Sequence, residues 1–191
     1  MNARPMHLHL TLTLVAVLTM ACAPAKAPPL TSLLLTGTDG TPHRLSDELH
    51  AHAYTAVVFF SRHCICQTAH NERIRSLIAR EGPRGVGFLV VDPEESATRE
   101  SDARESTERG YPIVLDTEGR LARALGADFA TYSAVLDSEG RVLYRGGFDS
   151  ERSHLSDSPR TYLANALDDL LDGKPPRQPQ TKPLGCALEL H

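Results

Sequence analysis

The stretch that decides the fold runs from residue 54 to residue 66 and reads Tyr54-Thr55-Ala56-Val57-Val58-Phe59-Phe60-Ser61-Arg62-His63-Cys64-Ile65-Cys66. Its first seven residues form an unbroken run rich in β-branched and aromatic side chains, which is typical of a central strand buried on both faces. Two cysteines follow in the turn after this run. We therefore expect a buried strand over 54–60 and reactive groups in the turn that leaves it.

The segments on either side of this turn predict a single α/β domain. Apolar residues at i, i+3 and i+4 predict an amphipathic helix over 68–81, which ends at Gly82-Pro83. Further segments predict a strand at 33–36, a turn at 38–42, a buried strand at 86–91, a surface helix at 94–109, a short strand at 112–115, a small helix at 121–125, a hairpin of 133–136 with 141–145, and a core-facing helix at 163–171. This order predicts a mixed central sheet flanked by helices.

Composition excludes several classes of protein. The chain has 191 residues, 41% of them hydrophobic and 23% charged, so it is neither disordered nor fibrous. A formal net charge of -4 argues against a nucleic-acid partner. Four cysteines are too few for a disulfide scaffold, although their even number allows two bridges.

The first 22 residues have the layout of a secretory signal peptide. Arg4 precedes an apolar run over 8–20, which is too short to span a bilayer comfortably. Thr19-Met20-Ala21-Cys22 resembles a bacterial lipobox, although Thr19 departs from the usual leucine, and a plain cut after Ala23 is the alternative. We expect export to the periplasmic side of the cell envelope and a membrane anchor through lipid on Cys22. Three thiols would then remain, and three cannot all pair within one chain.

The mature chain divides into three parts. A flexible Pro/Ala linker is expected at 23–31 and the folded domain at 32–172. The tail, 173–191, carries four prolines and Cys186, and we expect it to lie extended along the surface.

The cysteine-bearing turn favours nucleophilic chemistry. A cysteine at a helix N-terminus meets unpaired backbone N–H groups and the positive end of the helix dipole, both of which favour the thiolate. Arg62 and His63 add nearby positive character to Cys64. The alternative is that Cys64 and Cys66 are inert structural thiols, which two cysteines on an exposed turn make less natural.

Several motifs together resemble the thioredoxin-like redoxins, the broad group that includes alkyl-hydroperoxide-reductase and thiol-specific-antioxidant proteins. They are Val57 to Cys64, Val86 to Asp92, Tyr111 to Asp116, Val135 to Gly146, Leu163 to Leu171 and Gly185-Cys186. The resemblance covers roughly 33–188. It implies a thioredoxin fold, thiol-disulfide exchange with protein or small-molecule thiols and disulfides, and no cofactor.

The departures from these families shape the expected activity. The chain has no tryptophan, and its cysteines are spaced Cys64-Ile65-Cys66 rather than Cys-x-x-Cys. Relative to peroxiredoxins, Ser61 stands for a threonine but Val57 stands for a proline. Thr131-Tyr132-Ser133 takes the place of the thioredoxin cis-proline, so we expect a trans peptide bond at Tyr132. These changes argue against efficient thioredoxin-style substrate docking and against peroxide reduction as the main activity.

The resemblance implies that Cys64 is the attacking thiolate and that a second cysteine resolves the mixed disulfide. Cys66 would close a very small ring, whereas Cys186 could reach the site from the tail. Cys186 could equally be a permanent staple that pins the tail. We expect Asp92, Tyr132 and a buried Glu72 as candidates to tune the site.

A metal site is the alternative use of the same residues. Cys66 and His70 are i, i+4 and so share a helix face, with Cys64 just before them. Two thiolates and an imidazole suit Cu(I) or Zn(II). This layout resembles the exported Sco-type copper chaperones, although their cysteines are spaced Cys-x-x-x-Cys. In a chain with nine histidines, a solvated His70 is the ordinary interpretation.

Overall fold

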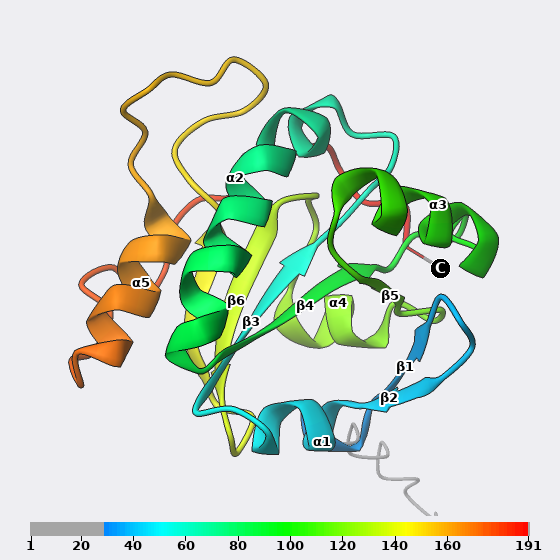
Figure 1. Ribbon diagram of the computed structural model, residues 1–191, viewed down its shortest axis with the longest axis horizontal. Coiled ribbons are helices and arrows are strands. Elements are labelled where there is room, and N and C mark those ends of the chain that lie inside the picture. The colour runs from blue at the N-terminus through cyan, green and yellow to red at the C-terminus, as the bar shows by residue number, and fades with distance from the viewer. Residues whose placement is uncertain (1–28, 191) are drawn as a thin grey trace, which may run out of the picture.

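The computed structural model describes residues 29–190 and has a seven-stranded sheet at its centre (Figure 1). The strands are β1 (Leu34–Gly37), β2 (Pro42–Arg44), β3 (Tyr54–Phe59), β4 (Val86–Asp92), β5 (Ile113–Leu115), β6 (Tyr132–Asp137) and β7 (Val142–Gly147). The helices are α1 (Leu45–His50), α2 (Ile65–Glu81), α3 (Arg99–Arg109), α4 (Arg120–Leu125) and α5 (Tyr162–Leu171), with short 3₁₀ turns at Leu30–Ser32 and Gly82–Arg84.

The sheet is mixed and β3 lies inside it. The strand order is β2-β1-β5-β4-β3-β6-β7, with β3 parallel to β4 and antiparallel to β6. A strand between two others and covered on both faces needs apolar side chains throughout, which explains the unbroken run at 54–60. The predicted α/β fold with a mixed sheet flanked by helices is confirmed.

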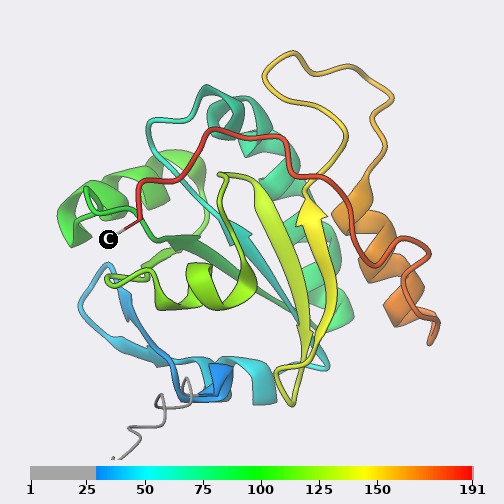
Figure 2. The same ribbon diagram turned by 180° about the vertical axis from the view of Figure 1, so that it is seen from behind.

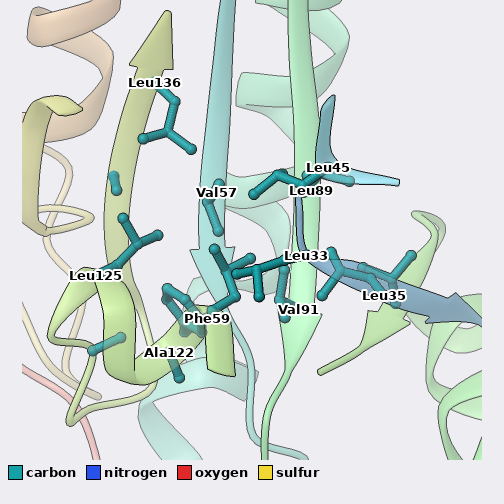
Figure 3. Packing of buried hydrophobic residues seen from close by; sticks show 14 of the residues in the cluster. Leu33, Leu35, Leu45, Val57, Phe59, Leu89, Val91, Ala122, Leu125 and Leu136 are labelled. Atoms are coloured by element: carbon teal, nitrogen blue, oxygen red, sulfur yellow. The ribbon is translucent and has the colours of Figure 1, made fainter. Parts of the chain in front are cut away.

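The two faces of the sheet hold separate hydrophobic clusters. Val57 and Phe59 point to one face, where they pack with side chains of α1 and α4 (Figure 3). Val58 and Phe60 point to the other face, where α2 and α5 cover them. This alternation follows from the two-residue period of a strand. It fixes the end of β3, and hence the cysteine turn, between two packed layers.

Three local details differ from the sequence-based expectation. The short elements β2 and α1 are not apparent from the sequence, since neither is long enough to show a period. The helix α2 begins at Ile65, three residues before the expected start. The helix α3 begins at Arg99 rather than at residue 94, because Thr98 and Ser101 form a capping box.

The N-terminal predictions fall largely outside the described residues. The signal peptide, Cys22 and most of the linker lie in residues 1–28. Within the described part of the chain, no helix has the length and apolar character needed to cross a membrane.

Candidate active site

The cysteine turn connects β3 to α2. Cys64 is the N-cap residue of α2, with extended backbone angles, and Cys66 lies in the first helical turn. The backbone N–H of Cys64 donates to the Ser61 carbonyl at 3.3 Å, and its own carbonyl accepts from the N–H of Thr68 at 3.1 Å. The first N–H groups of a helix have no partner within the helix. Cys64 therefore lies at the electropositive end of a 17-residue helix.

Cys64 is bonded to Cys186 on the C-terminal tail. Their Cα atoms are 5.6 Å apart, and the bond joins positions separated by 122 residues. The backbone N–H of Cys186 also donates to Cys64 Sγ, at 3.3 Å. Cys66 is a free thiol. Of the two cysteines that the sequence leaves open as partners of Cys64, Cys186 is the one in the bond.

The cysteines are buried, contrary to the expectation of an exposed turn. Only 1% of Cys64 and 2% of Cys66 is accessible, whereas Ile65 between them is 69% exposed. Ala130 belongs to the same buried cluster, and Cys186 and Leu188 pack against it. The tail supplies the cover that local sequence could not reveal, because it returns from more than 100 residues away.

The tail lies extended across the ends of the strands, as its prolines predict (Figure 2). It pairs with two separate loops. The Cys186 carbonyl accepts from the N–H of Ala130 at 2.9 Å, and the N–H of Leu188 donates to the backbone carbonyl of Asp128 at 3.0 Å. Beyond it, the Glu189 carbonyl accepts from the N–H of Glu95 at 2.9 Å. Cys186 is thus held by backbone bonds as well as by its sulfur.

Gly185 lets the tail approach this closely. A Cβ on Gly185 would lie 1.8 Å from the carbonyl oxygen of Ala130, which is far inside van der Waals contact. Earlier in the tail, the N–H of Thr181 donates to the Arg145 carbonyl of β7 at 3.1 Å. Arg177 holds the start of the tail through several hydrogen bonds to Asp169. These contacts define one continuous docked segment.

Thr131 stands where thioredoxins carry the cis-proline. The described chain has no cis peptide bond, which confirms the trans peptide expected at Tyr132. Thr131 instead has φ of 65°, the one left-handed conformation among the described non-glycine residues. A β-branched residue is strained there. Its N–H donates to the Phe59 carbonyl at 2.8 Å, and this bond ties the loop to the end of β3 beside the cysteines.

A buried acidic cluster lies at the neighbouring end of β4. Burial raises the pKa of Asp92 to about 8, although the N–H of Glu94 donates to its carboxylate. Burial likewise raises the pKa of Asp102 to about 6. The charge of Arg62 opposes both shifts. Asp92, a residue expected to tune the site, therefore holds its proton at neutral pH. The charge of Arg62, two residues before Cys64, acts on its carboxyl group.

His70 is buried and not solvated, which corrects the ordinary interpretation. Its Nδ1 lies 2.7 Å from the Cys66 carbonyl, and its Nε2 lies 2.9 Å from Asp149 Oδ1. Arg73 reaches the other oxygen of Asp149 at 2.5 Å. Although burial opposes it, the hydrogen bond from His70 holds the pKa of Asp149 below its usual value. Both ring nitrogens are engaged, so the set Cys64, Cys66 and His70 does not converge on a metal.

Two other expected tuning residues have different outcomes. Glu72 is exposed and pairs with Arg75, so the expectation of a buried charge there was wrong. Tyr132 is buried, and its hydroxyl donates to the Leu125 carbonyl at 2.8 Å. Burial raises the pKa of that hydroxyl. Tyr132 thus holds α4 against β6.

Residues 23–159 match the protein family described as Redoxin. The chain belongs to the redoxin family. The match spans the cysteine turn and the whole sheet, and it supports thiol oxidoreductase chemistry. A comparison with curated proteins finds no match for this redoxin.

Solved structures share the fold of this redoxin. An uncharacterised conserved protein from Geobacillus kaustophilus is 26% identical, with a TM-score of 0.75 over 86% of this chain and 90% of that chain. The bacterioferritin comigratory protein of Xanthomonas campestris, whose structure addresses alkyl peroxide reduction, is 18% identical, with a TM-score of 0.53 over 75% and 90%. The exposed lipoprotein thioredoxin Etrx1 of Streptococcus pneumoniae is 20% identical, with a TM-score of 0.53 over 74% and 98%.

Sequence reasoning did not find every residue that shapes the site of this redoxin. Asp149 lies 79 positions from His70, and no spacing rule links them. The hydrogen bonds that Ala130 and Asp128 make with the tail use backbone groups, which leave no signature in the sequence. The glycine before Cys186 was the one available signal for close backbone approach.

Proposed function

We propose that this redoxin is a thiol-disulfide oxidoreductase in which Cys64 attacks and Cys186 resolves. The observation that carries the proposal is the Cys64–Cys186 bond at the N-terminus of α2. A static bridge needs no particular position along a helix. A redox-active bridge is favoured at a helix N-terminus. When Cys64 leaves as a thiolate, the helix dipole and a backbone N–H stabilise its negative charge.

The reductive step follows from the difference in exposure between the two sulfurs. Cys64 is fully buried, whereas Cys186 is partly exposed. An external thiolate therefore attacks Cys186 Sγ and forms a mixed disulfide there. The electron pair of the broken S–S bond stays on Cys64, which leaves as a thiolate. A second external thiol then displaces Cys186, and both cysteines are reduced.

The oxidative half uses the same two sulfurs. The Cys64 thiolate attacks a substrate disulfide, and one substrate thiol leaves. The Cys186 thiolate then attacks Cys64 Sγ in the mixed disulfide, which expels the second substrate thiol and reforms the Cys64–Cys186 bond. The sum is one substrate disulfide reduced to two thiols and one dithiol oxidised, so atoms and electrons balance.

The surroundings of the bond suit a protein partner. Ile65 is 69% exposed next to Cys64, and Phe129 is 37% exposed in the segment that pairs with Ala187. Both side chains lie in segments next to the bond, where a partner protein that reached the disulfide would contact them. A partner protein thiol or disulfide is therefore the favoured substrate class, with small-molecule thiols as the alternative. Peroxide reduction would use the same Cys64 thiolate, as a slower activity.

The cellular location forms part of the proposal. The lipobox-like segment ending at Cys22 supports an exported lipoprotein held on the periplasmic side of the envelope. In a bacterial host, labelled palmitate should mark the wild-type protein, and Cys22→Ala should abolish both the label and the membrane fractionation. A membrane fraction that persists without the label would refute the anchor.

Mass mapping of disulfides combined with a turnover assay tests the chemistry. Cys64→Ser should abolish the reduction of insulin or of a mixed-disulfide substrate. In Cys186→Ser, Cys64 should still attack the substrate disulfide. The mixed disulfide on Cys64 should then accumulate, because no second thiol resolves it. Cys66→Ser distinguishes the two resolving candidates, since the mapped bond should remain Cys64–Cys186. Turnover that survives Cys64→Ser would contradict the proposed function.

A further inference from the structure

The three cysteine sulfurs lie close together. The Sγ atoms of Cys64, Cys66 and Cys186 are all within 4.8 Å of one another, and no other set of three potential metal ligands in residues 29–190 meets this distance. We propose that, once the Cys64–Cys186 bond is reduced, these three cysteines bind one Cu(I) ion as a trithiolate site. This goes beyond the exchange reaction proposed above, because it gives Cys66 a role that the reaction does not need.

The geometry requires only a small opening of the site. Three sulfurs at about 2.3 Å from one ion, the length of a zinc–thiolate bond, lie about 4 Å apart in a trigonal plane. The observed upper bound of 4.8 Å is compatible with that arrangement. Only Cys64 and Cys186 must separate from bonding distance. Cys64 and Cys66 are fixed at the start of α2, so the extended tail supplies the movement.

The surroundings favour a soft ion. Cys64 and Cys66 are almost completely buried, and Ala130 and Leu188 pack around them. Hard cations prefer oxygen ligands and water, whereas thiolates select soft ions such as Cu(I). Structural zinc takes four protein ligands. No fourth ligand joins the cluster among the described residues, so three-coordinate Cu(I) is the better fit.

The ligand set differs from the one that helix spacing suggests. His70 lies one turn after Cys66, but Asp149 and the Cys66 carbonyl engage its two ring nitrogens. Cys186 replaces it and arrives from the tail. The site therefore has three sulfur donors and no nitrogen donor, which a spectroscopic measurement can distinguish.

Binding depends on the redox state of the protein. A phosphine reduces the disulfide to two thiols and becomes the phosphine oxide, with water supplying the oxygen and both protons; alternatively, two equivalents of an external thiol are oxidised to one disulfide and supply both electrons and both protons. Each of the three thiols then loses its proton on binding copper, and the copper stays Cu(I) throughout. Within residues 29–190 the oxidised protein keeps only the Cys66 thiol, so it lacks the three-sulfur site.

The experiment compares the oxidised and reduced full chain. Wild-type protein is reduced anaerobically with a phosphine, freed of the reductant, and titrated with Cu(I) from its bicinchoninate complex. We expect one Cu(I) per reduced chain and at least 100-fold weaker binding to the oxidised chain. Cys66→Ser and Cys186→Ser should each weaken binding more than about 100-fold, since loss of an outer-shell partner alone costs 10–100-fold. His50→Ala removes an exposed histidine on α1, which lies before β3 in the chain, and is the control that should keep the copper.

X-ray absorption of the copper-loaded protein completes the test. Three sulfur scatterers and no nitrogen are expected. Two sulfurs, a nitrogen donor, unchanged affinity in Cys66→Ser, or a reduced chain that takes no copper would each overturn the proposal. None of these results would bear on disulfide mapping or turnover, so the proposed oxidoreductase function is tested separately.

Discussion

The Cys64–Cys186 bond should contribute a large share of the stability of this redoxin. It closes a loop of 122 residues. In the chain-entropy model, a cross-link of that length removes about 16 cal/mol/K from the unfolded chain, which is about 5 kcal/mol at 25 °C. Whole domains are stable by only about 5–15 kcal/mol. With a urea m-value of about 2–3 kcal/mol/M, the unfolding midpoint should fall by about 2 M when the bond is removed.

Urea unfolding followed by circular dichroism measures this effect. Cys64→Ser and Cys186→Ser remove the same bond and should lose similar stability. Cys66→Ala leaves the bond intact and should cost only about 1 kcal/mol, as a typical point substitution does. Since about 30 mV corresponds to 1.4 kcal/mol for this couple, the native bond should also be about 100 mV harder to reduce than the same bond in the unfolded chain. If Cys186→Ser unfolds at the same urea concentration as the oxidised wild type, the tail does not constrain the fold.

Three further predictions concern the surroundings of the bond. Gly185→Ala should displace the tail, because the added Cβ would overlap the Ala130 carbonyl, and a small dithiol should then reduce the disulfide faster. Gly82→Ala is the control, since a Cβ there meets nothing within 4 Å, and it should leave the reduction rate unchanged. Asp92→Asn should stabilise the protein at pH 8 by at least about 1.4 kcal/mol, the value of one pKa unit. The folded state holds the Asp92 proton up to about pH 8 and the unfolded state releases it near 3.8, so wild-type stability falls as the pH rises between these values. Equal urea midpoints for variant and wild type at pH 8 would contradict this. Asp149→Ala should cost about 1–3 kcal/mol at pH 7, since it leaves the buried Nε2 of His70 without its hydrogen-bond partner. Because the Asp149 pKa is lowered, this contribution is present above pH 3.8 and lost as the pH falls through the folded value; a variant as stable as wild type at pH 7 would refute it.

The sheet was predictable because its strands carry strong local signals. The run at 54–60 alternates between two packed faces, and a covered central strand uses mostly apolar, β-branched and aromatic residues. The helices 68–81 and 163–171 follow from their apolar spacing. Short elements such as α1 have too few residues for a period to emerge, and the start of α3 depends on a cap that the charged sequence around it conceals.

The site was predictable only in part, because its contacts are long-range. The position of Cys64 at a helix start follows from the strand before it and the helix after it. Its pairing with Cys186 does not, since the spacing leaves both Cys66 and Cys186 open. The burial of both cysteines and the hydrogen bond of His70 with Asp149 depend on segments that return from far along the chain, and no local pattern encodes them.

The position of the first described residues adds a consequence for orientation. The 3₁₀ turn at Leu30–Ser32 lies at the opposite end of β3 from Cys64 (Figure 1). A Cβ on Gly140, in the β6–β7 turn at that end, would touch Thr31. Six strand residues span about 20 Å, so the chain enters the domain about that far from its reactive rim. If the proposed lipid anchor holds the chain at its N-terminus, the domain is attached to the membrane by the end away from the disulfide. The end that carries the disulfide then stays accessible to partner proteins.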